Sequence, residues 1–347
     1  MQLDLVTLFS DPRLMLLGFD GDFARFVPMT RDSYERSIFA DNRVQPAPGQ
    51  AVRFPLDPLL DHLDKTGFKA PKINFIHHFA QSGSTLLARA LDRPENLVIR
   101  EPLHLRQLGV AFGAGVHGSL SADQRSVLAF SLSMLGKRFE PGSTLIVKGN
   151  VPIGLLADEI AELDPGQAGI LLYFPLEDYC AAVLRTPNHQ QWLGTVTEEI
   201  GLGLDPMVGD IANLTLAEKA AALWFSMIKR FERLLASNPQ MRSLDANALF
   251  DTPAETIAEA SKLLNAGIGA DEASSIAGGA LFATYSKNPD IPYDPALRIE
   301  RREEARQRLS SELLEARKWA ERRAERFGLS ARLGSPLLGE GPALMTQ

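Results

Sequence analysis

Four small or hydroxyl-bearing residues, Ser82 to Thr85, stand between two runs of different character. The apolar run Ile73 to Ile76 predicts a strand, and the run Thr85 to Leu91 predicts the start of a helix. The first N–H groups of a helix lack partners within it and carry partial positive charge, so such a turn can bind an anion. Gly83 allows a ligand to approach the backbone closely, and the neighbouring hydroxyls add donors for phosphate oxygens. The alternative is a strand–helix connection that binds nothing.

Two further residues can bring charge to this turn. Thr144 to Lys148 reads as a buried strand, and ligands of open α/β sheets bind beyond the carboxyl ends of the strands. Lys148 is therefore expected to reach an anion there, the alternative being a surface lysine. Adjacent strand residues point to opposite faces, so only one of His77 and His78 is expected to face the ligand. We choose His78, which precedes the turn directly, either as a cation or as a neutral hydrogen-bonding group.

Several reaction classes are disfavoured by missing residues. Ser84 stands where a nucleoside-triphosphate hydrolase has its loop lysine, and no apolar run ends in an aspartate placed to hold magnesium. The six histidines form no His-Glu-x-x-His pair or other spaced ligand set, so no metal site is expected. No Gly-x-Ser-x-Gly elbow indicates a serine hydrolase.

The stretch resembles the sulfotransferase family, whose 5′-phosphosulfate loop reads roughly Gly-x-Pro-Arg/Lys-Ser-Gly-Thr/Ser-Thr-Leu-Leu. Ser82 to Leu87 match in order, and Leu97 to Pro102, LVIREP, is similar to the second-strand segment of bacterial and tyrosylprotein sulfotransferases. The chain looks closest to divergent bacterial members. The resemblance implies that Glu101 takes the acceptor's proton and that Lys148 or His78 stabilises developing charge. It also implies that the donor PAPS (3′-phosphoadenosine 5′-phosphosulfate, leaving as PAP) is held by Gln81, Ser82, Gly83, Ser84 and Thr85.

The chain departs from the family at the donor site. The loop's Gly, Pro and basic residue are replaced by His78, Ala80 and Gln81, and a glutamine donates a hydrogen bond without bringing charge. The Arg and Ser that hold the 3′-phosphate are missing after the strand Ala168 to Phe174. The residues that would replace them are Arg185, about two turns into the next helix, and Lys287, whose alternative is a solvated loop lysine.

Three functions are therefore compared. The first is a sulfotransferase that transfers a sulfuryl group from PAPS to a hydroxyl or amine of a small-molecule or peptide acceptor. The second is a catalytically divergent protein of the same fold that binds another phosphorylated ligand or a partner. A small-molecule kinase is third, because its lysine and magnesium carboxylate are absent.

The amino-acid composition limits the size of the core, the classes of ligand and the compartment that can be expected. The 347 residues are 45% hydrophobic, enough for one large core, and the net charge of −7 argues against general nucleic-acid binding. Cys180 is the single cysteine, which excludes an intrachain disulfide and suits a reducing compartment. The start of the chain lacks the basic and apolar regions of a signal peptide, and no apolar run reaches the ~20 residues of a membrane span. A cytoplasmic protein is expected.

The fold that the resemblance implies is α/β, a three-layer P-loop-type parallel sheet flanked by helices. Residues 1–70 are expected to be an extension with a β-hairpin that lines the acceptor site or caps a sheet edge, 71–296 the main domain, and 329–347 a tail. Residues 297–328 are expected to form one charged helix that packs on the core or forms a homodimer interface. Smaller expectations are a loop over 41–55, a lid or loop over 200–213, and capping boxes at Thr215 with Glu218 and at Thr252 with Glu255.

Overall fold

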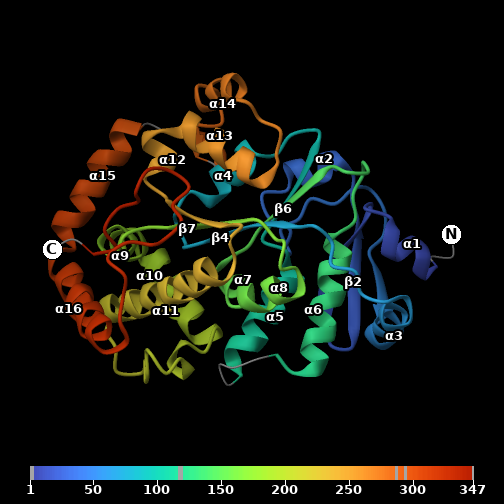
Figure 1. The fold of residues 1–347 in the computed structure, drawn as a ribbon, viewed down its shortest axis with the longest axis horizontal. Coiled ribbons are helices and arrows are strands. Elements are labelled where there is room, and N and C mark those ends of the chain that lie inside the picture. The colour runs from blue at the N-terminus through green and yellow to red at the C-terminus, as the bar shows by residue number, and fades with distance from the viewer. Residues whose placement is uncertain (1–3, 116–119, 286–287, 293–294, 346–347) are drawn as a thin grey trace.

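The computed structural model describes residues 4–115, 120–285, 288–292 and 295–345, and its centre is a parallel sheet with helices on both faces (Figure 1). The sheet has five strands in the order β5-β6-β4-β7-β8, and every neighbouring pair is parallel. All residues of β4, β5 and β7 are buried, as expected for strands covered on both faces. The predicted α/β class is confirmed. The strands are β4 (Asn74–His78), β5 (Asn96–Arg100), β6 (Thr144–Lys148), β7 (Gly169–Tyr173) and β8 (Met241–Asp245).

Among the described helices around the sheet, α6, α7, α10 and α11 begin at a side-chain cap. The box of Thr215 and Glu218 caps α11, the longest of them. The second box is wrong: the Thr252 hydroxyl donates to the carbonyl of Ala248 at 3.3 Å, which closes the preceding short helix instead. The helices are α4 (Ser84–Ala90), α5 (Leu103–Ala114), α6 (Ala122–Leu135), α7 (Val151–Gly154), α8 (Ala157–Leu163), α9 (Leu176–Leu184), α10 (Pro187–Glu199), η1 (Leu202–Leu204), α11 (Leu216–Ser237), α12 (Ala248–Asp251), α13 (Pro253–Leu264) and α14 (Ala270–Ala277).

The N-terminal extension forms its own antiparallel sheet. The predicted hairpin is present as β1 (Leu14–Asp20) and β2 (Phe23–Pro28), and it packs on α5 and α6. The segment expected to be a loop over 41–55 ends in a third strand, β3 (Val52–Pro55), because its apolar residues alternate and pair with β2. The helices of the extension are α1 (Leu5–Ser10), α2 (Arg31–Arg36) and α3 (Leu56–Thr66).

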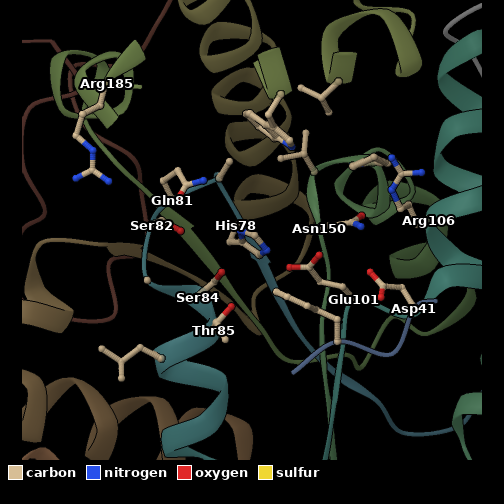
Figure 2. Close-up of a pocket in the computed structure, with 18 of the residues that line it drawn as sticks. Asp41, His78, Gln81, Ser82, Ser84, Thr85, Glu101, Arg106, Asn150 and Arg185 are labelled. Atoms are coloured by element: carbon tan, nitrogen blue, oxygen red, sulfur yellow. The ribbon is translucent and has the colours of Figure 1, made fainter. Parts of the chain in front are cut away.

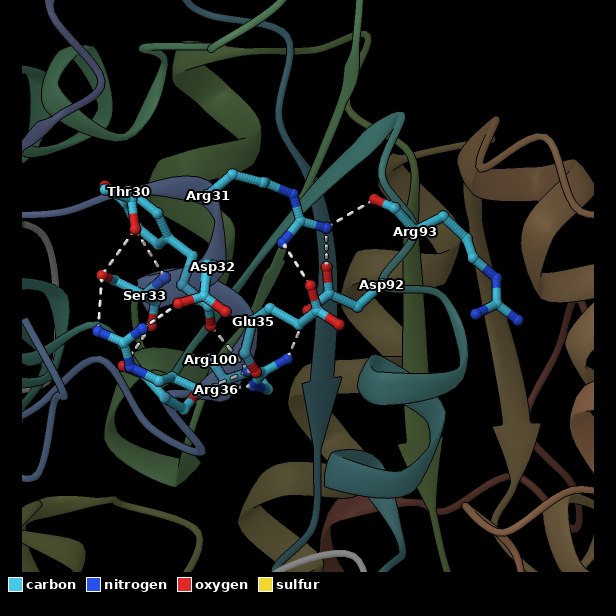
Figure 3. Close-up of polar contacts among 11 residues, drawn as sticks. Thr30, Arg31, Asp32, Ser33, Glu35, Arg36, Asp92, Arg93 and Arg100 are labelled. Atoms are coloured by element: carbon cyan, nitrogen blue, oxygen red, sulfur yellow. Dashed lines mark hydrogen bonds and ion pairs between the residues drawn. The ribbon is translucent and has the colours of Figure 1, made fainter. Parts of the chain in front are cut away.

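Helix α2 is fastened to the edge strand β5 by buried charges (Figure 3). Arg100 donates to the carbonyls of Tyr34, Glu35 and Ser37 at 2.6–2.9 Å, where the last turn of a helix leaves its carbonyls unpaired. Its other nitrogen donates to Asp92 at 2.8 Å, and Arg31 donates to the same carboxylate at 2.6 Å. The extension therefore covers one sheet edge and fixes the segment that follows α2 beside the end of β5.

The C-terminal part differs from the expected single helix. It is broken at Leu309 into α15 (Pro295–Arg308) and α16 (Ser310–Phe327), and α16 packs on α9 and α11 through Ala316, Trp319 and Ala320. The expected tail is also ordered in its described part: the amide of Ser243 donates to Ser335 at 3.0 Å along the edge of β8. The described helices include none that is long and apolar enough to cross a membrane.

Candidate functional site

A cavity of about 470 Å³ lies beyond the carboxyl ends of β4, β5 and β6, as expected for an open parallel sheet. Figure 2 shows its labelled residues in two groups: Arg185, Gln81 and Ser82 on one side, and Glu101, Asp41, Asn150 and Arg106 on the other. We call the side with Arg185 the arginine end, and the side with Glu101 and Asp41 the carboxylate end. The remaining lining residues are Phe39, Arg43, His78, Ala80, Gly83, Ser84, Thr85, Leu86, Val151, Pro152, Trp192, Val196, Phe250, Phe282, Thr284, Arg298 and Arg301.

The turn between β4 and α4 requires a glycine at position 83. Gly83 caps α4 in the left-handed region at φ +77°, where a side chain is disfavoured. A Cβ there would also lie 2.8 Å from Cζ of Phe250. Ser82 donates its hydroxyl to the carbonyl of Phe79 at 2.6 Å, so that proton is committed to the loop.

The Thr85 hydroxyl is different. Its oxygen is buried and has no hydrogen-bond partner among the described residues, although it lines the cavity. A buried hydroxyl without a partner costs about 1–3 kcal/mol, which a bound ligand oxygen would recover. Thr85 is thus the hydroxyl of the turn best suited to donate to a ligand.

The two histidines behave as the alternation of a strand dictates. His78 lines the cavity, whereas His77 is fully buried and stacks on Phe75 with ring centroids 5.4 Å apart. Burial, with a smaller contribution from the charge of Arg230, lowers the pKa of His77 to about 4, so this ring stays neutral. In His78, Nδ1 lies 2.8 Å from the carbonyl oxygen of Phe79. A carbonyl oxygen only accepts, so Nδ1 carries a proton and donates to it.

Glu101 follows β5 directly and forms an ion pair with Lys148 at the end of the neighbouring strand β6. The Lys148 side chain is 1% exposed and does not belong to the cavity lining, whereas Glu101 does. Lys148 therefore contacts the Glu101 carboxylate from outside the cavity lining. Its expected direct contact with an anion stays a prediction. Glu101 has a left-handed φ of +56°, which is rare and costly for a residue with a side chain. Gln81, with φ +65°, is a second such residue in the lining.

Arginines reach the cavity from the C-terminal part. Arg298 and Arg301 stand three residues apart on α15, so they share one face of the helix. The guanidinium of Arg298 lies 3.8 Å above the ring of Phe250, the residue that covers Gly83. Sequence reasoning missed both arginines because their acidic neighbours made the helix look evenly charged. Lys287 lies outside the described residues.

The carboxylate end contains charges that are matched within the protein. Arg43 donates to Asp41 at 2.9 Å, and Arg106 donates to Glu199 at 2.6 Å. Phe39 lies beneath the Arg43 guanidinium at 3.9 Å. Three of these residues come from the N-terminal extension, which was expected either to line the acceptor site or to cap the sheet edge. It does cover the edge, and it lines this cavity as well.

Two other expectations bear on the site. The segment 200–213, expected to be a lid or a loop, is a loop that contains the short helix η1. The helix before it, α10, was not predicted, and it supplies Trp192 and Val196 to the lining. Thr186 followed by Pro187 was the available signal, since it gives an N-cap and a proline at the first helical position. Within the described ranges, no group of three or more His, Cys, Asp or Glu side chains is arranged to hold a metal ion.

Comparison with known proteins gives structural neighbours only. No protein-family model matches the chain, and no curated protein does. A sulfotransferase from Alicyclobacillus acidocaldarius is 13% identical with a TM-score of 0.40, covering 73% of this chain and 95% of that one. The sulfotransferase domain of the curacin biosynthetic pathway is 16% identical with a TM-score of 0.41, covering 75% and 98%. Both neighbours are sulfotransferases, the family that the sequence resembles.

Proposed function

We propose that this protein is a sulfotransferase that transfers a sulfuryl group from PAPS to a hydroxyl or amine of a small-molecule or peptide acceptor. The observation that carries the proposal is the composition of the cavity. Its arginine end combines the turn Ser82–Thr85 with arginines, and its carboxylate end presents Glu101. An anionic donor and a proton acceptor are thereby brought within one small-molecule cavity.

The residues of the arginine end fit a donor with two anionic groups. The turn, with the buried Thr85 hydroxyl as donor, binds the 5′-phosphosulfate. Arg298, Arg301 and Arg185 bind the 3′-phosphate, since guanidinium groups pair with phosphate oxygens through two parallel hydrogen bonds. These arginines take the place of the missing family residues after β7.

The carboxylate end performs the proton transfer. The acceptor's hydroxyl or amine gives its proton to Glu101 as its oxygen or nitrogen bonds to sulfur, and the sulfur–oxygen bond to the 5′-phosphate breaks, releasing PAP. Lys148 holds the Glu101 carboxylate in place through the ion pair. His78, beside the turn, acts as the imidazolium: it donates from Nε2 to charge that develops on the leaving oxygen, the role for which Gln81 lacks charge. Sulfuryl transfer of this kind depends on positioning and anion stabilisation.

A second candidate is supported by one observation. Gln81 replaces the basic loop residue of the family, so a protein that binds a phosphorylated ligand without transferring a group would keep the same arginine end. The two functions differ in whether Glu101 affects turnover, and they share the expectation that a bisphosphate binds.

The first test is a calorimetric titration with PAP, with adenosine 5′-phosphosulfate and ATP–Mg as comparators. We expect PAP to bind most tightly. Gly83→Asp is expected to weaken PAP binding at least about 100-fold, because it places a like charge and a side chain in the turn, at a cost of several kcal/mol.

Gly142→Asp is the matched control. Gly142 also has a left-handed φ, of +84°, but an added Cβ meets nothing there and the residue lies outside the cavity lining. It is expected to leave the PAP affinity unchanged. Absence of PAP binding to the unaltered protein would contradict the use of PAPS, and a preference for ATP–Mg would favour a kinase.

A further inference from the structure

Asp178 is a buried carboxylate in the first turn of α9, just after β7. It accepts hydrogen bonds from Arg302 at 2.6 Å and from Arg306, both on α15. Burial alone would raise the pKa of Asp178, but the charges of Arg302 and Arg306 and the hydrogen bond from Asn247 lower it below the usual value. The carboxylate is therefore ionised and pairs with two arginines of one helix.

Asn247 connects this ion pair to the cavity. Its side-chain amide donates to Asp178 at 2.9 Å, and its carbonyl oxygen accepts from Arg302 at 2.8 Å and from Arg298 at 3.4 Å. Arg298 in turn lies 3.8 Å above Phe250, whose ring edge covers Gly83. A continuous set of contacts thus leads from Asp178, which lies outside the cavity lining, to the turn that lies within it.

We propose that Asp178 is a positioning residue for anion binding: it docks α15 on the sheet so that Arg298 and Arg301 face the turn. Arg302 and Arg306 form the ion pairs with Asp178 that dock the helix, and they do not line the cavity. Arg298 and Arg301, on the same helix, line the cavity, where they contact the ligand. The inference rests on the proposed function for the identity of that ligand, but the docking of α15 stands on the contacts alone.

The chain offers a matched control in the preceding residue. Glu177 is also on α9 and accepts from an arginine at 2.6 Å, but this arginine is Arg317 on α16. No residue of α16 lines the cavity. Glu177→Gln therefore removes the negative charge from an acid–arginine pair of the same length on the same helix, without loosening α15.

The test compares Asp178→Asn with Glu177→Gln by calorimetric titration with PAP and by hydrogen exchange of α15. Asp178→Asn is expected to weaken PAP at least about 10-fold, because one bidentate charged contact is worth about that much, and to speed exchange in α15. Glu177→Gln is expected to change the affinity less than about 2-fold. A purely structural role for Asp178 would lower the melting temperature and leave the PAP affinity unchanged, which would overturn the inference.

A triple variant tests whether Asp178 acts through these two arginines. If Asp178 acts through Arg298 and Arg301, then adding Asp178→Asn to the pair Arg298→Gln and Arg301→Gln changes the affinity no further. Additive losses would contradict the proposal. Should Asp178→Asn fail to fold, Arg302→Gln removes the same contact from the partly exposed side and is judged by the same criteria.

A second titrant allows the role of Asp178 to be tested separately from the use of PAPS. Inorganic pyrophosphate is titrated beside PAP on the unaltered protein and on each variant. If pyrophosphate binds and PAP does not, the use of PAPS is wrong, and the role of Asp178 is judged from the pyrophosphate affinities. If neither anion binds the unaltered protein, both proposals fail.

Discussion

Replacing Glu101 by Gln is expected to slow sulfuryl transfer by about 100- to 10,000-fold, the usual contribution of a positioned general base. An amide has nearly the same size as the carboxylate but cannot take the acceptor's proton. The donor contacts come from the other end of the cavity, so the PAP affinity is expected to stay within about 2-fold of the original. The measurement is the rate of sulfated product formation from PAPS with the acceptor that a screen identifies, together with a PAP titration.

Asp41→Asn is the variant with which Glu101→Gln is compared. Asp41 is the other carboxylate at this end of the cavity, but its oxygens already accept from Arg43. We expect the Asp41 variant to lose less than about 10-fold in rate, mainly through the acceptor's KM. If the two variants exchanged their effects, Asp41 would be the base and the roles given above would be reversed. A Glu101→Gln enzyme with undiminished turnover would favour the candidate in which the protein only binds its ligand.

The strands and the turn could be predicted because their signals are local. β6 and β7 are short apolar runs, β4 overlaps the apolar run Ile73 to Ile76, and Gly83 with its hydroxyl neighbours stands where a strand changes to a helix. Strand alternation predicted that only one of His77 and His78 faces the cavity, and the position of His78 directly before the turn selected it. The same local reasoning failed at Thr252, where two helices compete for one hydroxyl.

The rest of the site depends on tertiary placement. The pairing of Glu101 with Lys148 follows from the adjacency of β5 and β6, and strand order has no local signal. Arg298 and Arg301 enter the cavity because α15 is docked by Asp178, a contact between residues far apart in the chain. The sequence alone shows only a charged helix, and nothing in it distinguishes these two arginines from the others on the same helix.

Arg100→Met is expected to lower the free energy of unfolding by about 3–5 kcal/mol, the cost of breaking a buried ion pair by removing one partner. The Arg100 side chain is 1% exposed and that of Asp92 is 4% exposed, so the carboxylate cannot recover hydration and keeps only its ion pair with Arg31. The carbonyls of Tyr34, Glu35 and Ser37 lose their donor at the same time (Figure 3). The measurement is chemical denaturation followed by circular dichroism.

Arg100→Met is also expected to weaken acceptor binding, because backbone hydrogen bonds connect the segment after α2 to the residues around Glu101. Ala40 donates to the Arg100 carbonyl at 2.6 Å and accepts from Leu103 at 3.0 Å, so the segment that carries Phe39 and Asp41 is tied to both sides of Glu101. When α2 loosens, hydrogen exchange is expected to rise across residues 31–43, and the acceptor's KM is expected to rise more than the PAP dissociation constant.

Arg36→Gln provides the control on the same helix. Arg36 pairs with Asp32 at the surface, where the Asp32 side chain is 75% exposed, and such pairs contribute at most about 1 kcal/mol. A change in unfolding free energy below about 1 kcal/mol for Arg100→Met would show that this cluster does not hold the extension. The carboxylate end would then have to be fixed by the packing of β1 on α5 and α6, independently of α2.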